Sequence, residues 1–143
     1  MAAIYLFRLF FTFFSVIIAG ADIKNGEVPR LAFILAFPVF FIMKFLINGR
    51  IMITESIAGA AAGFLVFILA FIITNKKLGL ADVWYSALTG MALGTWQWYL
   101  STLFACVTGV FIILIISKNI SKKQIPFIPC MAAGNILIFL TGG

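Results

Sequence analysis

Residues 75–90 read NKKLGLADVWYSALTG, in which a pair of lysines and a glycine precede an aspartate and an apolar run. The aspartate, Asp82, is one of only four acidic residues in a chain that has no histidine. A carboxylate in this place can simply stabilise the start of a helix. It can also belong to a functional site, because ionisable residues at membrane depth are costly and tend to be functional. The rest of the sequence bears on this choice.

The composition is that of a membrane protein. The chain has 143 residues, of which 64% are hydrophobic and 10% charged, and its mean hydropathy is +1.22. Soluble domains are about half apolar, so we predict an all-α, polytopic membrane protein with a single domain over residues 1–143. The net charge of +6 does not indicate nucleic-acid binding, because the lysines and arginines fall mostly between apolar runs. A lipid bilayer is the expected surrounding.

Six apolar segments are predicted to be transmembrane helices: residues 4–21, 31–47, 52–74, 82–95, 98–117 and 125–141. A span needs roughly 20 residues, and the fourth segment is short by this measure. Threading the six in order places most of the cations on one side, namely Lys24, Arg30, Lys76, Lys77, Lys118, Lys122 and Lys123. The positive-inside rule assigns that side to the cytoplasm and both termini to the outside.

The opposite side carries fewer cations and a group of aromatic residues. Arg8, Lys44 and Arg50 are the cations there, and Trp96, Trp98 and Tyr99 lie between the fourth and fifth segments. Tryptophan and tyrosine gather at membrane interfaces, so we expect these three to form an aromatic belt at the outer interface.

The third segment contains Gly59-Ala60-Ala61-Ala62-Gly63, a G-x-x-x-G pattern. Small side chains let helix backbones approach closely. We expect the Gly59/Gly63 face to pack against a neighbouring span or against a second copy of the chain, which would make it a homo-oligomer.

A second aspartate, Asp22, follows the first segment in GADIKNGEVPR, residues 20–30. Two crossings separate it from Asp82, so both residues are predicted at the cytoplasmic ends of their helices. Two carboxylates that converge in a low-dielectric site can share one proton, so that one acts as general base and the other as general acid. This chemistry uses no metal or cofactor. Cys106 and Cys130 form no C-x-x-C motif, and without histidine they predict no zinc site.

Three segments resemble the type IV prepilin peptidases, intramembrane aspartic proteases with a G-x-G-D signature. DIKNGEVPR, residues 22–30, resembles the segment of the first aspartate, with Pro29 opening the next helix. LGLADVW, residues 78–84, resembles the second-aspartate motif. IPFIPCMAAG, residues 125–134, resembles the proline-rich opening of the last helix.

The resemblance implies that Asp22 and Asp82 are the catalytic pair and that Gly79 is the first motif glycine. It also implies that Pro126 and Pro129 shape the last helix near the site. The implied function is an aspartic endopeptidase in the cell membrane of a prokaryote, which removes the short basic leader of pilin-like or preflagellin-like precursors. The cysteine-rich domain of the two-activity enzymes has no counterpart here. We therefore expect the peptidase-only branch, with no N-terminal methylation domain.

Ala81 departs from the motif, because it stands where the family has its second glycine. We expect its methyl group to restrict positive φ, to crowd a substrate backbone and so to lower activity. Two other functions stay open at this stage. One is a non-catalytic membrane homologue that serves as a binding or assembly component, and the other is a small proton or cation transporter that uses the aspartates.

Overall fold

The computed structural model describes residues 2–25, 30–48, 53–73, 80–116 and 128–141. Within these ranges the chain is all-helical and has no strand. Its six helices there are α1 (Ala2–Asn25), α2 (Arg30–Asn48), α3 (Ile53–Ile73), α4 (Leu80–Leu93), α5 (Thr95–Ile116) and α6 (Ile128–Leu140). Each of the six predicted segments overlaps one of these helices, which confirms the all-α prediction.

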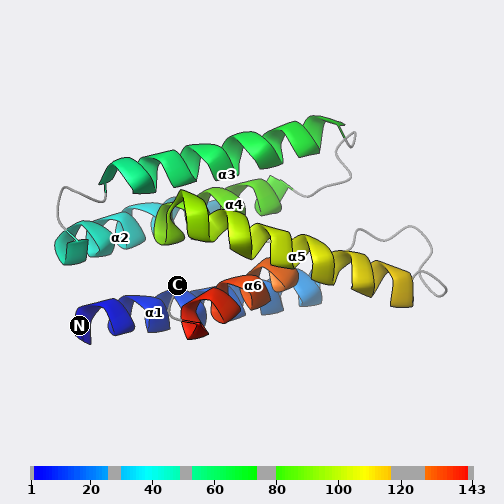
Figure 1. Ribbon diagram of the computed structural model, residues 1–143, viewed down its shortest axis with the longest axis horizontal. Helices are drawn as coiled ribbons and strands as arrows, with labels where there is room; N and C mark the ends of the chain where they lie inside the picture. The colour runs from blue at the N-terminus through cyan, green and yellow to red at the C-terminus, as the bar shows by residue number, and fades with distance from the viewer. Residues whose placement is uncertain (1, 26–29, 49–52, 74–79, 117–127, 142–143) are drawn as a thin grey trace.

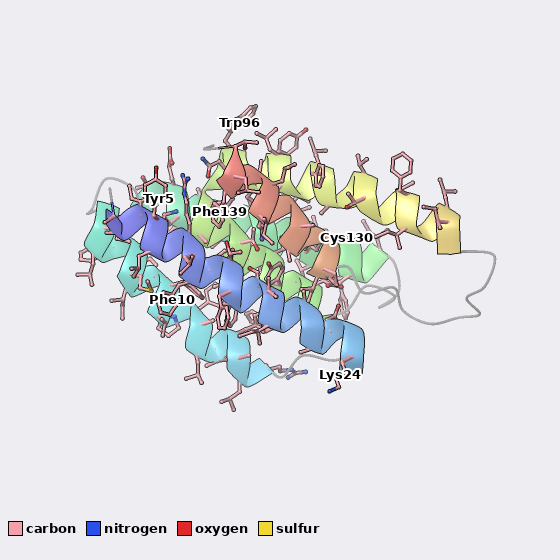
Figure 2. All side chains as sticks on the ribbon, turned by 90° about the horizontal axis from the view of Figure 1, so that it is seen from below. Tyr5, Phe10, Lys24, Trp96, Cys130 and Phe139 are labelled. Atoms are coloured by element: carbon pink, nitrogen blue, oxygen red, sulfur yellow. The ribbon has the colours of Figure 1, made fainter. Side chains whose placement is uncertain are left out.

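The helices run up and down along one long axis (Figure 1). α1, α3 and α5 end at the same end of the bundle at which α2, α4 and α6 begin. We call this the proximal end; it holds Asn25, Leu80 and Ile128, and the opposite, distal end holds Leu93 and Leu140. Figure 2 shows Lys24 and Cys130 toward the proximal end and Trp96 and Phe139 toward the distal end.

Helix length differs within the bundle. In the described residues, three stretches are long and apolar enough to cross a membrane: Ala2–Asp22, Arg30–Ile47 and Ile53–Ile73. By contrast, α4 has 14 residues and α6 has 13, so each is about 20 Å long at 1.5 Å per residue. The hydrocarbon core is about 30 Å thick. Six helices are therefore confirmed, but six full-length spans are not.

The side chains are arranged for a hydrocarbon surrounding. Large apolar residues project from the outer faces of the helices (Figure 2); for example, Leu9 is 70% and Ile115 is 75% exposed. The buried polar and charged residues in the described part of the chain are Ser15, Asp22, Ser56, Asp82, Ser86, Thr89, Ser101 and Asn135. Apolar groups outside and hydrogen-bonding groups inside are the expected distribution for a membrane protein.

Helix α4 lies at the centre of the bundle and packs against α2, α3, α5 and α6. Eleven of its 14 residues are buried. Its closest approach is to α3: a methyl group on Gly59 would overlap the carbonyl oxygen of Gly90, and one on Gly63 would lie 2.5 Å from the carbonyl oxygen of Ser86. The G-x-x-x-G face of α3 is thus covered by a neighbouring helix of the same chain and is not free to hold a second copy.

The turn between α4 and α5 lies at Gly94, whose φ of 87° favours glycine. α5 therefore begins at Thr95, earlier than predicted, and the three aromatic residues lie in its first turns. Trp96 and Tyr99 are exposed and stack with their ring centroids 6.2 Å apart. Trp98 is 5% exposed and donates a hydrogen bond from Nε1 to Ser86 Oγ over 3.0 Å. The prediction of a belt position for Trp98 is wrong, because its indole N–H is satisfied inside the bundle.

Two cations interact with helix ends at the distal end. Lys44 Nζ, from α2, donates to the carbonyl oxygens of Met91 and Ala92 in the last turn of α4, over 2.8 and 2.9 Å. Arg8 Nη1, from α1, donates to the carbonyl oxygen of Phe139 in α6 over 3.5 Å, and its guanidinium lies 5.5 Å from the centre of the Phe139 ring. Positive charge is favourable at a helix C-terminus, so these residues stabilise the ends of the two short helices.

Candidate active site

Asp82 lies in the first turn of α4 and is 6% exposed. The helix begins two residues earlier, at Leu80, so Asp82 is a helical residue and not the N-cap. The unpaired N–H groups and the positive dipole end of the first turn favour a carboxylate there. The start of α4 therefore stabilises a buried anion at the proximal end.

Asp22 lies in the last turn of α1, which continues to Asn25. It is 8% exposed, and its Oδ2 atom is buried without a hydrogen-bond partner among the residues that the structure describes. The C-terminal end of a helix is the unfavourable end for a carboxylate. A buried carboxylate oxygen with these surroundings is suited to accept a hydrogen bond from a group that comes from outside the fold, such as water or a peptide.

One contact in the core relates the helix faces that carry the two aspartates. Asp22 follows Ser15 by seven residues, two helical turns, so both lie on one face of α1; Asp82 shares a face of α4 with Tyr85, one turn later. The hydroxyl groups of Ser15 and Tyr85 are neighbours in the core, although they are not aligned for a hydrogen bond. The faces of α1 and α4 that carry the aspartates therefore approach each other at Ser15 and Tyr85.

The contact also gives the positions of the aspartates along the bundle axis. α1 and α4 run in opposite directions (Figure 1). From the Ser15–Tyr85 contact, Asp22 lies about 10 Å and Asp82 about 4.5 Å farther toward the proximal end, at 1.5 Å per residue. In the described part of the chain, these two are the only charged residues that are buried. The two carboxylates thus lie toward the same end of the bundle, offset by about 6 Å along its axis.

Ala81 does not have the backbone conformation that we expected. It is the second residue of α4, half-buried, and it packs against the hydrophobic core. Since a right-handed helix has negative φ, no positive φ is required there, and alanine is the residue that helices favour most. The expected backbone restriction is therefore wrong; only crowding of a substrate remains as an effect of the methyl group.

The other motif positions are only partly described. Pro129 is the second residue of α6, in the first turn, where a proline costs no helical hydrogen bond. It lies at the proximal end, as do the two aspartates. Pro29, Gly79 and Pro126 lie outside the described residues.

A buried polar cluster that was not predicted from the sequence lies one to two turns from Asp82. Its members are Tyr85, Thr89, Ser101 and Asn135, all at most 2% exposed. The signal was available in the sequence, because polar residues inside predicted spans generally face the interior of a helix bundle. Thr89 follows Asp82 by seven residues, which places the two on one face of α4.

Comparison with known proteins identifies the family. Residues 9–114 match the type IV leader peptidase family. A prepilin leader peptidase/N-methyltransferase of Bacillus subtilis (strain 168) is 31% identical over 132 residues, an alignment that covers 89% of this chain and 52% of the relative. The chain thus spans about half the length of that protein. No solved structure matches at a significant level. The match extends across both aspartate segments and most of the bundle, and the chain belongs to the type IV leader peptidase family.

Proposed function

We propose that this protein is an aspartic endopeptidase of the membrane, with Asp22 and Asp82 as its catalytic pair. The observation that carries the proposal is the burial of both carboxylates toward the proximal end of an apolar bundle. Membership of the type IV leader peptidase family supports the reaction class. It also supports the substrate, a pilin-like or preflagellin-like precursor from which a short leader is removed.

The reaction needs one ionised and one protonated carboxyl group. Two carboxyl groups in a low-dielectric site favour this state, because both cannot ionise at once. The ionised group takes a proton from a water molecule, whose oxygen attacks the scissile carbonyl carbon. The protonated group donates its proton to the carbonyl oxygen, which gives a tetrahedral diol. The group that took the proton from water then gives it to the leaving amine as the carbon–nitrogen bond breaks, and the other group takes a proton back from a diol hydroxyl as the carbonyl re-forms. The pair returns to its starting state with one proton shared.

The proposed topology gives six membrane-embedded helices with the proximal end at the cytoplasmic face and both termini outside. The excess of lysine and arginine in the parts of the sequence that connect α1 to α2, α3 to α4 and α5 to α6 supports this orientation. A precursor with a basic leader and an apolar helix would then keep its leader in the cytoplasm and its helix in the bilayer. The junction between them would lie near the depth of the two aspartates. The chain would be a multi-pass protein of the cell membrane of a prokaryote.

The catalytic pair is tested by conservative substitution. Asp22→Asn and Asp82→Asn keep the size of the side chain but cannot take up or release the proton, so each should abolish cleavage of a pilin-like precursor. The double variant should be no worse than either single variant, because the two residues act as one unit. Glu55→Gln, an exposed carboxylate in the first turn of α3, is the matched control and should retain activity.

Each outcome of this experiment has a definite meaning. Substantial cleavage by a folded Asp82→Asn protein would refute the aspartic mechanism. A folded wild type that cleaves none of a panel of precursors would favour the non-catalytic homologue, and ion flux in proteoliposomes would favour the transporter. The helical conformation of Ala81 supports the catalytic reading, because no positive φ is required there; the non-catalytic alternative then rests on crowding of a substrate by the methyl group.

The orientation is tested by thiol labelling in a protein that lacks Cys106 and Cys130. Lys24→Cys, exposed at the proximal end, should react with an impermeant reagent from the cytoplasmic side alone. Thr95→Cys, exposed at the start of α5 at the distal end, should react from the outside alone. Labelling of both from one side would refute the proposed topology.

A further inference from the structure

A single buried amide joins three helices in the middle of the bundle. Asn135 of α6 is 1% exposed. Its Oδ1 accepts a hydrogen bond from Ser101 Oγ of α5 over 2.5 Å. Its Nδ2 donates to Tyr85 Oη over 3.1 Å and to Thr89 Oγ1 over 3.3 Å, both on α4. Both N–H bonds of the amide are therefore used on α4, and its oxygen is used on α5.

The two partners on α4 share the face that carries Asp82. Tyr85 and Thr89 follow Asp82 by three and seven residues, so all three lie on one side of the helix. If α4 rotated about its axis, both bonds would break and the amide N–H groups would be left unpaired in apolar surroundings. An unsatisfied buried donor is costly, so the amide resists this rotation.

The cluster also reaches α1, the helix of Asp22. The hydroxyl group of Ser15, which is fully buried, lies beside that of Tyr85. Tyr85 thus contacts the amide of α6 on one side and the Asp22 face of α1 on the other. A change in the rotation of α4 would move Tyr85 away from Ser15 and Asp82 away from Asp22 together.

We propose that Asn135 is a positioning residue: its amide fixes the rotation of α4 through Tyr85 and Thr89, and thereby the alignment of Asp82 with Asp22. The effect on cleavage rests on the proposed function. The alignment itself can be measured without any cleavage, so the two proposals can fail separately.

Cross-linking measures the alignment directly. Cysteines replace both aspartates, Asp22→Cys and Asp82→Cys, in a protein whose native cysteines are alanine, and a short membrane-permeant reagent joins them. Asn135→Leu should slow cross-linking by about tenfold, since leucine fills the space but makes none of the three hydrogen bonds. Thr102→Val is the matched control: it removes a buried hydroxyl group outside the cluster, one with no hydrogen-bond partner in the described residues, and should leave the rate unchanged.

Kinetics of the full chain with its aspartates give the second measurement. Tyr85→Phe and Thr89→Val each remove one partner of the amide with little change in volume, so they stay informative if Asn135→Leu does not fold. Each should lower kcat by about tenfold with KM within about twofold, because a misplaced catalytic group weakens the transition state more than substrate binding. Thr102→Val should match the wild type.

Folded variants of the cluster with unchanged cross-linking and unchanged kcat would overturn the proposal, even if their thermal stability fell, because the cluster would then only stabilise the bundle. A wild type that cleaves no precursor would count against the proposed function alone. In that case the cross-linking rates still decide whether Asn135 aligns the two aspartates.

Discussion

Replacing Gly59 by alanine adds a methyl group where α3 touches the backbone of α4. The new Cβ would overlap the carbonyl oxygen of Gly90 and lie 2.8 Å from its carbonyl carbon. These are backbone atoms, which cannot rotate away as a flexible side chain can. α3 and α4 would have to separate by roughly 1 Å to restore a carbon–carbon contact of about 3.5–4.0 Å.

The expected loss of stability follows from two opposing effects. Overpacking costs about 1–3 kcal/mol, and a contact between two rigid backbones belongs at the upper end. The better helix propensity of alanine offsets about 0.8–1.0 kcal/mol of this loss in stability. Gly59→Ala should therefore lower the free energy of unfolding by about 2 kcal/mol. Gly20→Ala is the matched control, because a methyl group there meets no atom within 4 Å; it gains helix propensity alone and should stabilise the protein by up to about 1 kcal/mol.

The assay is reversible unfolding in mixed micelles of sodium dodecyl sulfate and a mild detergent, followed by circular dichroism. Since α4 carries Asp82, the separation should also lower cleavage, by up to about 100-fold for a misplacement of 1 Å. Equal unfolding free energies for the two alanine variants would refute the close approach of α3 and α4.

Three more substitutions test other contacts of α4. Lys44→Met removes two hydrogen bonds from an ammonium group and should lower the free energy of unfolding by about 3 kcal/mol. Lys44→Arg should keep most of that free energy, and equal stability of the two variants would contradict the role of Lys44 at the end of α4. Trp98→Phe should lower the free energy of unfolding by about 1–2 kcal/mol, because the hydrogen bond to Ser86 is lost. Trp96→Phe, at an exposed position, should leave it almost unchanged, and unfolding of the two variants measures the difference. Ala81→Gly should cost about 0.5–1 kcal/mol and preserve cleavage of the precursor; a folded glycine variant that cleaves more slowly would show that the methyl group helps catalysis.

Hydropathy was sufficient to predict the helices. Every apolar segment became a helix in the described residues, because a chain in hydrocarbon must satisfy its backbone hydrogen bonds within each segment. The order of crossings placed Asp22 and Asp82 at one end, and the structure has both at the proximal end. The G-x-x-x-G pattern of α3 predicted a close helix contact but did not say whether α4 or a second copy would make it.

The details that hydropathy missed depend on contacts between distant residues. The end of α4 is set by the positive φ of Gly94 and by hydrogen bonds from Lys44, 47 residues away from Met91 in sequence. A hydropathy window does not detect such a turn inside an apolar stretch. The fifth helix was therefore predicted to start too late. Trp98 was assigned to the interface because its buried partner, Ser86, could not be foreseen from composition. The position of Asn135 inside a predicted span indicated that it is buried, but its partners come from α4 and α5 and could not be foreseen.

The length of α4 explains why so many contacts converge on it. A helix of 14 residues is about 21 Å long and is shorter than a hydrocarbon core of about 30 Å, so the two membrane interfaces cannot fix both of its ends. Contacts within the protein do so instead, and each restrains a different movement. Gly59 and Gly63 set the distance of α4 from α3, Lys44 holds its distal end along the axis, and the Asn135 amide sets its rotation. Together they determine where Asp82 lies relative to Asp22, which the bilayer alone could not.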